Sequence, residues 1–464
     1  MFLLVICGEF FNVGLAKGIF VQKLKIAVVG SGISGLSAAW LLSKRHDVTL
    51  FEAEAKAGGH ANTLKMGQGK NKTSVDVGFI VYNEATYPNF VALLDLLGVE
   101  TAPSEMGFSV SMNGGKVEYA GNSLTNLIGS PRNLVSPAHW RMISDLIRFY
   151  RNAKALAAGI DDELSLGQFL ARHHFNEAFI TRHLVPMSAA IWSCPPHEIM
   201  HYPARAFISF FENHQLLALG QRKAWRTVKN GSQHYVERLI EAIGKTVCGD
   251  PVQRITRTNR GVEITNASGA VEVFDHVVIA AHADQALGML AQPTQNEADL
   301  LSAFTYSDNQ VFVHRDPKLM PKAKRLWSSW NYSGDAATDT CSVTYWMNKL
   351  QPLATQENYF VSLNPIQRPD QQLIESEFMC THPIFTAQTR AAQQQLWDLQ
   401  SERGIWFCGA YFGAGFHEDG LQAGLAVAEE LGGVARPWNV ADASGRIHVR
   451  GRAFSSEQFL QAAE

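Results

Sequence analysis

The sequence lacks the features that mark secreted, membrane-spanning and nucleic-acid-binding proteins. Its six cysteines are scattered and none forms a CxxC pair, which argues against a disulfide framework and a zinc ribbon. No uninterrupted apolar run reaches the roughly 18 residues that a membrane span needs. The formal net charge is −3, so no global field favours nucleic acid. These absences predict a cytoplasmic protein with reduced thiols.

The sequence also lacks internal repeats, low-complexity tracts and runs of like charge. A chain of 464 residues is too long for one simple core, so we expect roughly two to three domain-sized units. Met1–Ala16 is apolar, but Glu9 interrupts it and it lacks the basic N-terminal region of a signal peptide. We therefore expect residues 1–24 to be a dispensable extension rather than a signal peptide.

The most informative stretch runs from Lys25 to Gly59. Ile26–Val29 is a short β-branched run, which predicts a buried strand. A helical pattern follows through Leu36–Leu42, and Val48–Phe51 predicts a second strand. The first strand and the helix are joined by Gly30-Ser31-Gly32-Ile33-Ser34-Gly35. This order predicts a βαβ unit with a glycine-rich first turn.

Each part of this unit suits a bound dinucleotide. Gly30 allows the tight turn, Gly32 leaves room for a pyrophosphate, and Gly35 lets the helix pack close to the sheet. Free N–H groups and the dipole at the helix N-terminus attract phosphates. Glu52, on the order of 20 residues beyond the glycines, can accept hydrogen bonds from a ribose and would repel a 2′-phosphate. The unit therefore predicts a dinucleotide other than an NADP-type one.

The motifs that follow resemble a known family. A second glycine pair occurs in Ala57-Gly58-Gly59-His60, and Asp76-Val77-Gly78 comes shortly after it. The order GxGxxG, FEA, GG(H/R), D-x-G resembles the FAD-dependent amine oxidase superfamily, which includes protoporphyrinogen oxidases and phytoene-type desaturases. The resemblance implies FAD as cofactor, with the second glycine pair near the diphosphate and flavin.

The end of the chain continues the resemblance. Ile405–Ala410 predicts a buried strand, and His417-Glu418-Asp419-Gly420 opens an apolar helix. The resemblance implies that this helix N-terminus points at the flavin, where its dipole stabilises negative charge. Relatives carry an acidic residue after the strand glycine, whereas Ala410 follows Gly409 here. We expect Glu418 or Asp419 to replace that contact.

The complete set of cofactor-binding residues that the resemblance implies combines both ends of the chain with two positions between them. It comprises Gly30, Ser31, Gly32, Ile33, Ser34, Gly35, Glu52, Ala53, Gly58, Gly59, His60, Val252, Ala280, Gly409, Glu418, Asp419 and Gly420.

The middle of the chain narrows the resemblance. Met187–Ser193, Asn213–Leu217 and Trp225–Val228 look like a bacterial subgroup that is often encoded beside cyclopropane-fatty-acid synthases. This implies a fatty-acyl or phospholipid acyl substrate, which gives a hydride to flavin N5 and is desaturated or dehydrogenated. Candidate catalytic residues near the flavin are Trp192, His214, Tyr345, Tyr411 and His417.

Three other functions stay open at this stage. A flavin-dependent amine oxidase is the weaker alternative, because no lysine in the C-terminal segments stands out as the flavin-facing lysine of some amine oxidases. A flavin-dependent isomerase would show no net oxidation. A non-catalytic lipid-binding protein on the same fold would bind no flavin, and the intact glycine set with Glu52 argues against it.

The expected fold is α/β, a Rossmann-type FAD-binding domain with an inserted α+β substrate domain. We assign residues 25–98, 226–300 and 400–435 to the FAD-binding domain and residues 99–225 and 301–399 to the substrate domain. Residues 436–464 are expected to form a C-terminal tail. The active site should lie between the two domains. The oligomeric state is not predicted.

Two further patterns bear on metals and membranes. His197-Glu198-Ile199-Met200-His201 matches HExxH, but flanking prolines leave too short a helix for zinc, so we predict no metal site. Residues 139–154 predict a basic amphipathic helix with Trp140, Ile143, Ile147 and Tyr150 on one face. Its expected role is packing on the core, and the alternative is peripheral contact with an anionic membrane.

Overall fold

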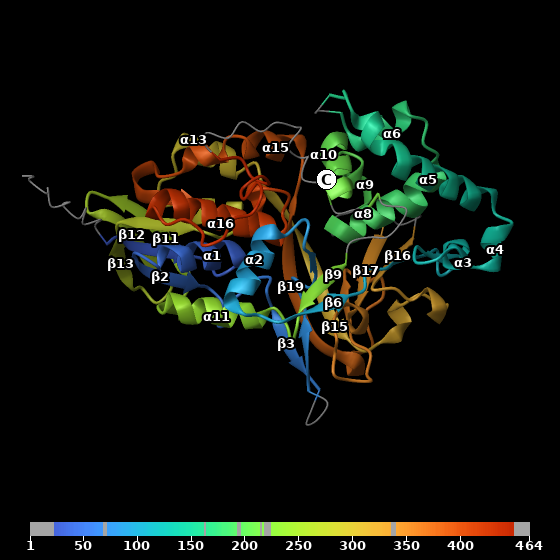
Figure 1. The fold of residues 1–464 in the computed structure, drawn as a ribbon, viewed down its shortest axis with the longest axis horizontal. Coiled ribbons are helices and arrows are strands. Elements are labelled where there is room, and N and C mark those ends of the chain that lie inside the picture. The colour runs from blue at the N-terminus through green and yellow to red at the C-terminus, as the bar shows by residue number, and fades with distance from the viewer. Residues whose placement is uncertain are drawn as a thin grey trace, which may run out of the picture.

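The computed structural model describes residues 23–67, 72–161, 164–192, 196–213, 216–217, 224–335 and 340–449. Two parts lie side by side along the long axis of the molecule (Figure 1). The part on the left in this view contains a parallel sheet, and the part on the right contains a larger sheet covered by helices. No helix within the described ranges is long and apolar enough to span a bilayer.

A five-stranded, wholly parallel sheet forms the centre of the domain that is expected to bind FAD, which is called the FAD-binding domain below. Its strand order is β10-β2-β1-β14-β20, and the strands come from three distant parts of the chain. Strands buried on both faces of a parallel sheet are continuously apolar, as in Ile26–Val29 and Val277–Ile279. The bounds are β1 Lys25–Val29, β2 Asp47–Glu52, β10 Thr246–Cys248, β14 His276–Ile279 and β20 Ile405–Phe407.

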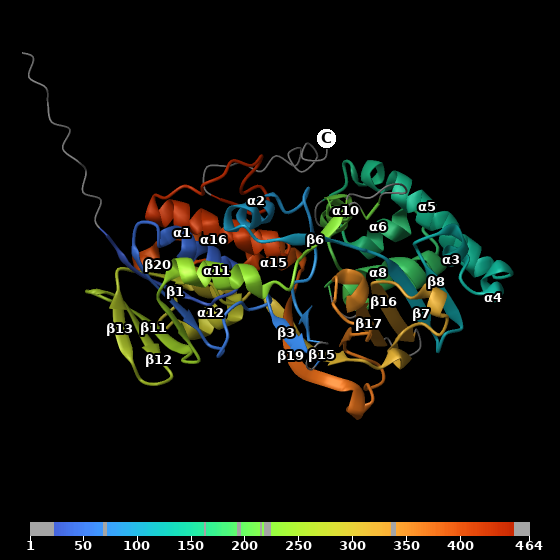
Figure 2. The ribbon, with the colours of Figure 1, turned by 60° about the horizontal axis from the view of Figure 1, so that its bottom comes forward.

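Three helices cover one face of this sheet: α1 (Ile33–Leu42), α11 (Gln233–Ile243) and α16 (His417–Gly432). The antiparallel sheet β11 (Val252–Thr258), β12 (Gly261–Asn266) and β13 (Val271–Phe274) lies on the other side with α12 (Ala283–Met289), as Figure 2 shows. The helices α1 and α16 pack closely because small residues face each other. A Cβ added at Gly424 would lie 2.1 Å from the Ser34 carbonyl oxygen.

Smaller elements complete this domain and join it to the next. Two-stranded β3–β4 and three-stranded β5-β9-β6 lie near the junction, and α2 packs against α11 and α16. The bounds are β3 Thr63–Met66, β4 Thr73–Asp76, β5 Tyr82–Asn83, α2 Pro88–Leu97, β6 Thr101–Ser104, β9 Trp225–Val228, α13 Gln295–Leu301 and α15 Ala387–Gln393. The boundary expected at residue 399 is too late, because Ala392, Leu396 and Trp397 pack into the core of the FAD-binding domain.

The substrate domain is built on a seven-stranded sheet of order β19-β15-β18-β17-β16-β7-β8. Only the β7–β16 pair is parallel. Helices α5, α6, α8, α9 and α10 lie above this sheet in Figure 1, and α3 and α4 lie at its right-hand end. The strands are β7 Phe108–Met112, β8 Val117–Ala120, β15 Thr305–His314, β16 Trp330–Asp335, β17 Thr340–Trp346, β18 Phe360–Leu363 and β19 Ile374–Ile384. The helices are α3 Leu124–Ile128, α4 Pro131–Leu134, α5 Pro137–Ala157, α6 Leu166–Arg172, α7 Glu177–Phe179, α8 Val185–Trp192, α9 Pro196–Ile199, α10 Ala204–Asn213 and, after β17, α14 Met347–Leu350.

Helix α5 contains the predicted amphipathic segment. Ile143, Ile147 and Tyr150 of the expected face are partly buried and pack against neighbouring hydrophobic clusters, and the adjacent residues Met142, Leu146 and Phe149 are buried. Trp140 is the exception on the expected face, because it is 47% exposed. Helix α9 ends at Ile199, so His201 of the HExxH match lies beyond it.

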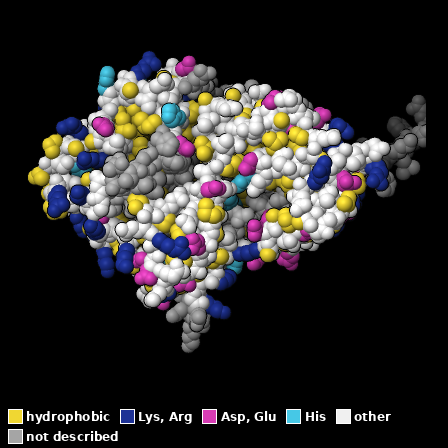
Figure 3. All heavy atoms as spheres, turned by 180° about the vertical axis from the view of Figure 1, so that it is seen from behind, with side chains coloured by type: hydrophobic (Ala, Val, Ile, Leu, Met, Phe, Trp, Pro, Cys, Tyr) yellow, Lys and Arg dark blue, Asp and Glu magenta, His cyan; other side chains and the backbone are white. Residues whose placement is uncertain are grey.

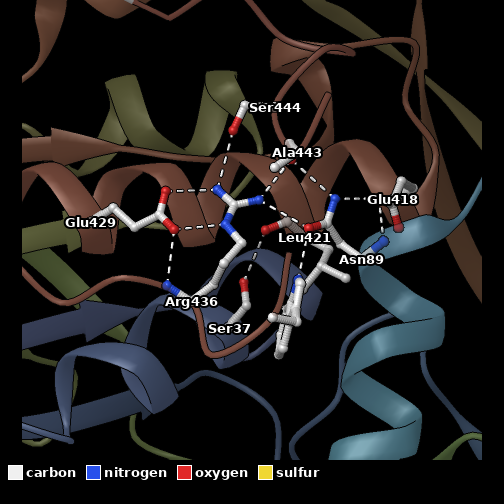
Figure 4. A network of polar contacts seen from close by, with 9 residues as sticks. Ser37, Asn89, Glu418, Leu421, Glu429, Arg436, Ala443 and Ser444 are labelled. Atoms are coloured by element: carbon white, nitrogen blue, oxygen red, sulfur yellow. Dashed lines mark hydrogen bonds and ion pairs between the residues drawn. The ribbon is translucent and has the colours of Figure 1, made fainter. Parts of the chain in front are cut away.

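The described part of the expected tail, residues 436–449, packs against the FAD-binding domain. Arg436 donates to both carboxylate oxygens of Glu429, at 2.6 and 2.7 Å, and also to Asn89 Oδ1 and the Ala443 carbonyl (Figure 4). Asn89 in turn donates to Glu418 on α16. Ile447 is 1% exposed in the same core. These residues form a strap across α16 and α2 rather than a free tail.

Candidate functional site

A cavity of about 800 Å³ lies between the two domains. At one end it is lined by Gly30 and Ala280, which directly follow β1 and β14, by Gly409, two residues after β20, and by Glu52, the last residue of β2. Ligands of open parallel sheets bind beyond the carboxyl ends of the strands, which is this position. Its volume is in the range of a site for a large cofactor together with part of a substrate.

The glycine-rich turn forms one wall of the cavity. Gly30, Ser31, Gly32, Ile33 and Ser34 all line it. A Cβ added at Gly32 would meet nothing within 4 Å, so the space next to this residue is open. Gly35 does not line the cavity, and its Cβ would lie 1.8 Å from the Gly30 carbonyl oxygen. Gly35 therefore permits the close packing that the sequence predicts for it.

The N-terminus of α1 suits a diphosphate. No side chain caps it, and its first turn carries no acidic residue. The first N–H groups of a helix need partners from outside the helix, and a phosphate group in this position supplies acceptors and a favourable charge. The open space at Gly32 and the uncapped helix together fit the diphosphate of a dinucleotide.

Glu52 lies at the end of β2 and faces the same wall. Its Oε2 accepts a hydrogen bond from the Ser31 N–H at 2.9 Å and another from the Ser31 hydroxyl, and its Oε1 accepts one from the Glu54 N–H at 2.9 Å. The Ser31 Oγ also accepts from the Gly58 N–H. Glu52 thus holds the turn in place, and its carboxylate lines the cavity, where a ribose hydroxyl can donate to it.

The structure brings most of the other predicted cofactor residues to the same cavity. Ala53, Gly59, His60, Val252, Ala280 and Gly409 line it. Gly58 and Gly420 do not. Gly58 supports Ser31 from behind, and a Cβ at Gly420 would lie 2.8 Å from the Ser34 hydroxyl. Both glycines act through close packing rather than by facing the cavity.

Helix α16 points its first residue, His417, into the cavity. The His417 ring stacks on Phe79 at 3.8 Å between centroids, and its Nε2 is 2.7 Å from the Tyr235 hydroxyl. Burial, together with a smaller contribution from the nearby His60, lowers the pKa of His417 to about 3. A neutral imidazole and a helix N-terminus therefore meet at this wall.

Glu418 and Asp419 do not line the cavity, so the expectation that they replace the missing acidic contact is wrong. Glu418 accepts from the N–H groups of Asn89 and Phe90 at 3.1 and 3.0 Å and so caps α2. Asp419 accepts from the Phe416 N–H at 2.7 Å and from Arg446 Nε at 2.6 Å. These partners, the amides of α2 and the side chain of Arg446, lie outside the motif, so the motif alone could not predict the contacts of Glu418 and Asp419.

Three of the five candidate catalytic residues face the cavity: Tyr345, Tyr411 and His417. Tyr345 belongs to the substrate domain, and Tyr411 follows β20. Residue 214 lies outside the described residues, so the structure does not test the prediction for His214. Trp192 ends α8, and the structure does not describe its side chain.

Sequence reasoning missed a polar cluster in the cavity wall. His60 Nε2 lies 3.2 Å from Cys380 Sγ, and Cys380 Sγ lies 4.0 Å from His382 Nε2. His282 is next to them, stacked on Tyr306 at 4.4 Å. Cys380 and His382 lie on β19, on the order of 300 residues from His60, and no local motif links these positions. A wall of His and Cys side chains is the main polar feature beyond the glycine-rich turn.

One hydrogen bond of this cluster indicates the tautomer of His382. Asn309 Nδ2 donates to His382 Nδ1 at 3.1 Å and also to the Ser307 carbonyl, so His382 carries its proton on Nε2. Burial raises the pKa of Cys380 to about 11, so it remains a thiol, and its Sγ lies within hydrogen-bond distance of His60 Nε2. The three ligand atoms have the spacing of a metal site. The proton on His382 Nε2 argues against one, since a metal-binding histidine donates from its other nitrogen.

The far end of the cavity is apolar. Side chains from the substrate domain supply most of it, including Met106, Phe108, Met187, Ile191, Phe210, Val311 and Leu363. Trp330 and Tyr345 add aromatic surface, and their rings meet edge to face at 5.1 Å. Among the described residues that line the cavity, Glu52 is the sole carboxylate and none is Lys or Arg.

Comparison with solved structures gives the same architecture. Cyclohexylamine oxidase from Brevibacterium oxydans is 17% identical with a TM-score of 0.64, over 88% of this chain and 100% of that chain. A putative protoporphyrinogen oxidase from Exiguobacterium is 13% identical with a TM-score of 0.62, over 89% and 99%. A CLA-producing fatty acid isomerase from P. acnes is 14% identical with a TM-score of 0.60, over 88% and 98%. At these identities the likeness shows the fold.

Sequence comparison supplies the family. A search of curated protein sequences gave no significant match. The model of the flavin containing amine oxidoreductase family matches residues 33–362, which is more than half of the chain. These residues include α1, the second glycine pair and most of the substrate domain. The chain belongs to the flavin-containing amine oxidoreductases and is an FAD-dependent oxidoreductase.

Proposed function

We propose that this protein dehydrogenates or desaturates a fatty-acyl chain, free or in a phospholipid. The observation that carries the proposal is the apolar end of the cavity, which contains methionine, aromatic and branched aliphatic side chains and none of the described Lys, Arg, Asp or Glu. An alkyl chain gains free energy by leaving water for such a wall, at roughly 0.8 kcal/mol per buried CH₂ group.

The same wall disfavours a charged amine. Moving an ammonium group out of water is costly unless a carboxylate or several acceptors compensate it. The one carboxylate of the described wall, Glu52, lies at the glycine-rich turn and already accepts three hydrogen bonds. Amine oxidation is therefore the second candidate, open to a substrate that enters uncharged.

The side chains of the protein would orient the substrate, exclude water from the reaction centre and provide a proton acceptor. FAD, when bound, supplies the hydride acceptor that no side chain provides. Gly30–Ser34, Glu52 and Val252 would hold its nucleotide end, and Gly409 and His417 lie on the wall where the rest would extend. The apolar side chains orient the alkyl chain and exclude water, which protects the reaction centre.

Desaturation also releases a proton from the substrate. His60 is the group in the wall that we assign to this proton, because its imidazole lines the cavity, where its side chain is exposed. The surrounding protein and the nearby His282 lower the pKa of His60 to about 4, so it is neutral at pH 7. A neutral imidazole has one unprotonated ring nitrogen, which can accept a proton.

Anaerobic reduction tests the function directly. We expect fatty acids, acyl esters or phospholipids with alkyl chains to bleach the oxidised-flavin absorption near roughly 450 nm, with an additional double bond in the product. Primary amines of similar length are the matched comparison. Bleaching by amines alone would overturn the lipid assignment. A rearranged lipid without net oxidation would instead indicate an isomerase, and protein that binds no FAD would indicate a carrier.

The His60→Gln variant is expected to lower the rate of this reduction by about 100- to 10,000-fold, the usual contribution of one general base. FAD content should stay close to that of the wild type, because glutamine keeps the length and polarity of the side chain. For the wild type, the rate should be level from pH 6 to 8 and fall only near pH 4, where His60 takes up a proton. Stopped-flow absorbance across this pH range measures both.

Cys380→Ala is the control, since it removes only the weak S–H donor and should change the rate by less than tenfold. A His60→Gln variant as fast as the wild type, with the same pH profile, would exclude His60 as the proton acceptor.

A further inference from the structure

Exposed apolar side chains are concentrated at one end of the substrate domain. Of the eight large hydrophobic residues that are exposed in the described structure, four lie between residues 124 and 140. Leu124 is 82% exposed, Leu134 52%, Val135 83% and Trp140 47%. A soluble domain rarely leaves neighbouring large apolar side chains in water without a partner. We call these four residues and their basic neighbours the tip surface. The basic neighbours are Arg132, Arg141, Lys324 and Arg325.

The tip surface is one continuous and firmly held structure. Asn133 Nδ2 donates to the Ile128 carbonyl at 2.8 Å, which joins α4 to the end of α3. Trp140 Nε1 donates to the Leu134 carbonyl at 2.9 Å, which joins α5 to α4. The apolar side chains are thus displayed on fixed backbone, and Trp140 combines an apolar ring with a bonded polar atom, as aromatic residues at lipid–water interfaces do.

The two chain segments that carry these residues and their basic neighbours contain charges of one sign. Residues 119–144 contain no Asp or Glu, and Arg132 and Arg141 are exposed beside Leu134 and Trp140. Residues 317–334 contain no Asp or Glu either. Arg325 from this segment donates to Asn126 Oδ1 at 3.1 Å, which places it and the exposed Lys324 next to α3. Figure 3 shows Lys, Arg and hydrophobic side chains gathered at this end of the molecule, on the left in that view.

We propose that the tip surface docks on an anionic lipid bilayer. Apolar side chains that enter the interface, ringed by cations that attract anionic headgroups, form the combination that binds peripheral proteins to membranes. The site shares only Trp140 and Arg141 with residues 139–154 considered above. On that helix Arg148 pairs with Asp145 at 2.9 Å and Lys154 is held by Glu212, so these cations already have intramolecular partners. The inference rests on the proposed function in one respect: the bilayer would be the source of an acyl substrate only if the substrate is a lipid.

Vesicle flotation of the FAD-loaded full chain tests the proposal. Wild type is expected to bind vesicles of phosphatidylglycerol and phosphatidylcholine more tightly than vesicles of phosphatidylcholine alone, and to dissociate as salt rises. The double variant Leu134→Glu, Val135→Glu should bind at least about tenfold more weakly, because it places carboxylates where apolar groups enter the interface. Arg132→Gln with Lys324→Gln should lower binding to the anionic vesicles only.

Val271→Glu is the matched control, because Val271 is 58% exposed on β13 of the other domain and should change nothing. All variants should keep wild-type flavin absorption and the same rate on a detergent-dispersed substrate, so a failed lipid reaction is distinguishable from failed docking. Equal vesicle binding by wild type and the Leu134→Glu, Val135→Glu variant would overturn the proposal. So would a concentration-dependent dimer that this variant abolishes, which would assign the surface to a second copy of the chain.

Discussion

The Glu52→Arg variant is expected to be purified without FAD and to regain it at least about 100-fold more weakly than the wild type. Glu52 has two tasks: its carboxylate accepts from the N–H and hydroxyl of Ser31, and it faces the cavity where a ribose would donate. Arginine has no acceptor, so both tasks fail at once. The ratio of flavin to protein absorbance, followed by titration with FAD, measures the effect.

Glu54→Arg is the control for charge. Glu54 is exposed two residues away, and its backbone N–H, which the substitution keeps, is its contact with Glu52. Glu52→Gln should lie between the two variants, because its amide oxygen retains one acceptor. Wild-type flavin content in Glu52→Arg would remove Glu52 from the cofactor site.

The Arg436→Met variant should lower the free energy of unfolding by about 3 kcal/mol, the cost of breaking a buried ion pair. The Arg436 side chain is 5% exposed and makes a two-point contact with Glu429, which then loses its partner (Figure 4). Asn89 Oδ1 and the Ala443 carbonyl also lose a donor. Urea denaturation of the FAD-loaded protein measures the change, with the slope checked for a single transition.

Lys229→Met provides the comparison, because its partner Glu100 is exposed and such pairs contribute little. A cycle with Glu429→Gln should give less than additive losses, since the two side chains form one unit. Stability unchanged from that of the wild type would mean that residues 436–449 do not hold α16 and α2.

Local chemistry made the glycine-rich turn predictable. A β-branched strand, glycines at the turn and an acidic residue at the end of the second strand are close together in sequence, so their geometry follows from one βαβ unit. Glu418 and Asp419 show the limit of this reasoning. Their positions at the start of a helix were clear, but their partners Asn89 and Arg446 come from segments whose placement depends on the whole fold. The exposure of Trp140 on α5 also depends on the whole fold and was not predicted.

The polar cluster was beyond sequence reasoning. His60 belongs to the nucleotide-binding unit and Cys380 to the substrate domain, and their contact arises only when β19 lies against the second glycine pair. The tip surface could be predicted in part. Its basic and aromatic residues were visible in the sequence, but their exposure depends on which face of α5 the core covers.

The distance along the chain between the two helices at the cofactor site has a consequence for biosynthesis. The Ser37 hydroxyl and the Leu421 carbonyl lie 3.5 Å apart in space and 384 residues apart in sequence. At about 5 to 20 residues per second, a ribosome needs roughly 20 to 80 s to make the intervening chain. A nascent chain therefore displays its glycine-rich turn long before α16 exists to close the wall. FAD binding is then expected to be one of the last steps of maturation. A chain that ends before α16 would lack part of the binding site.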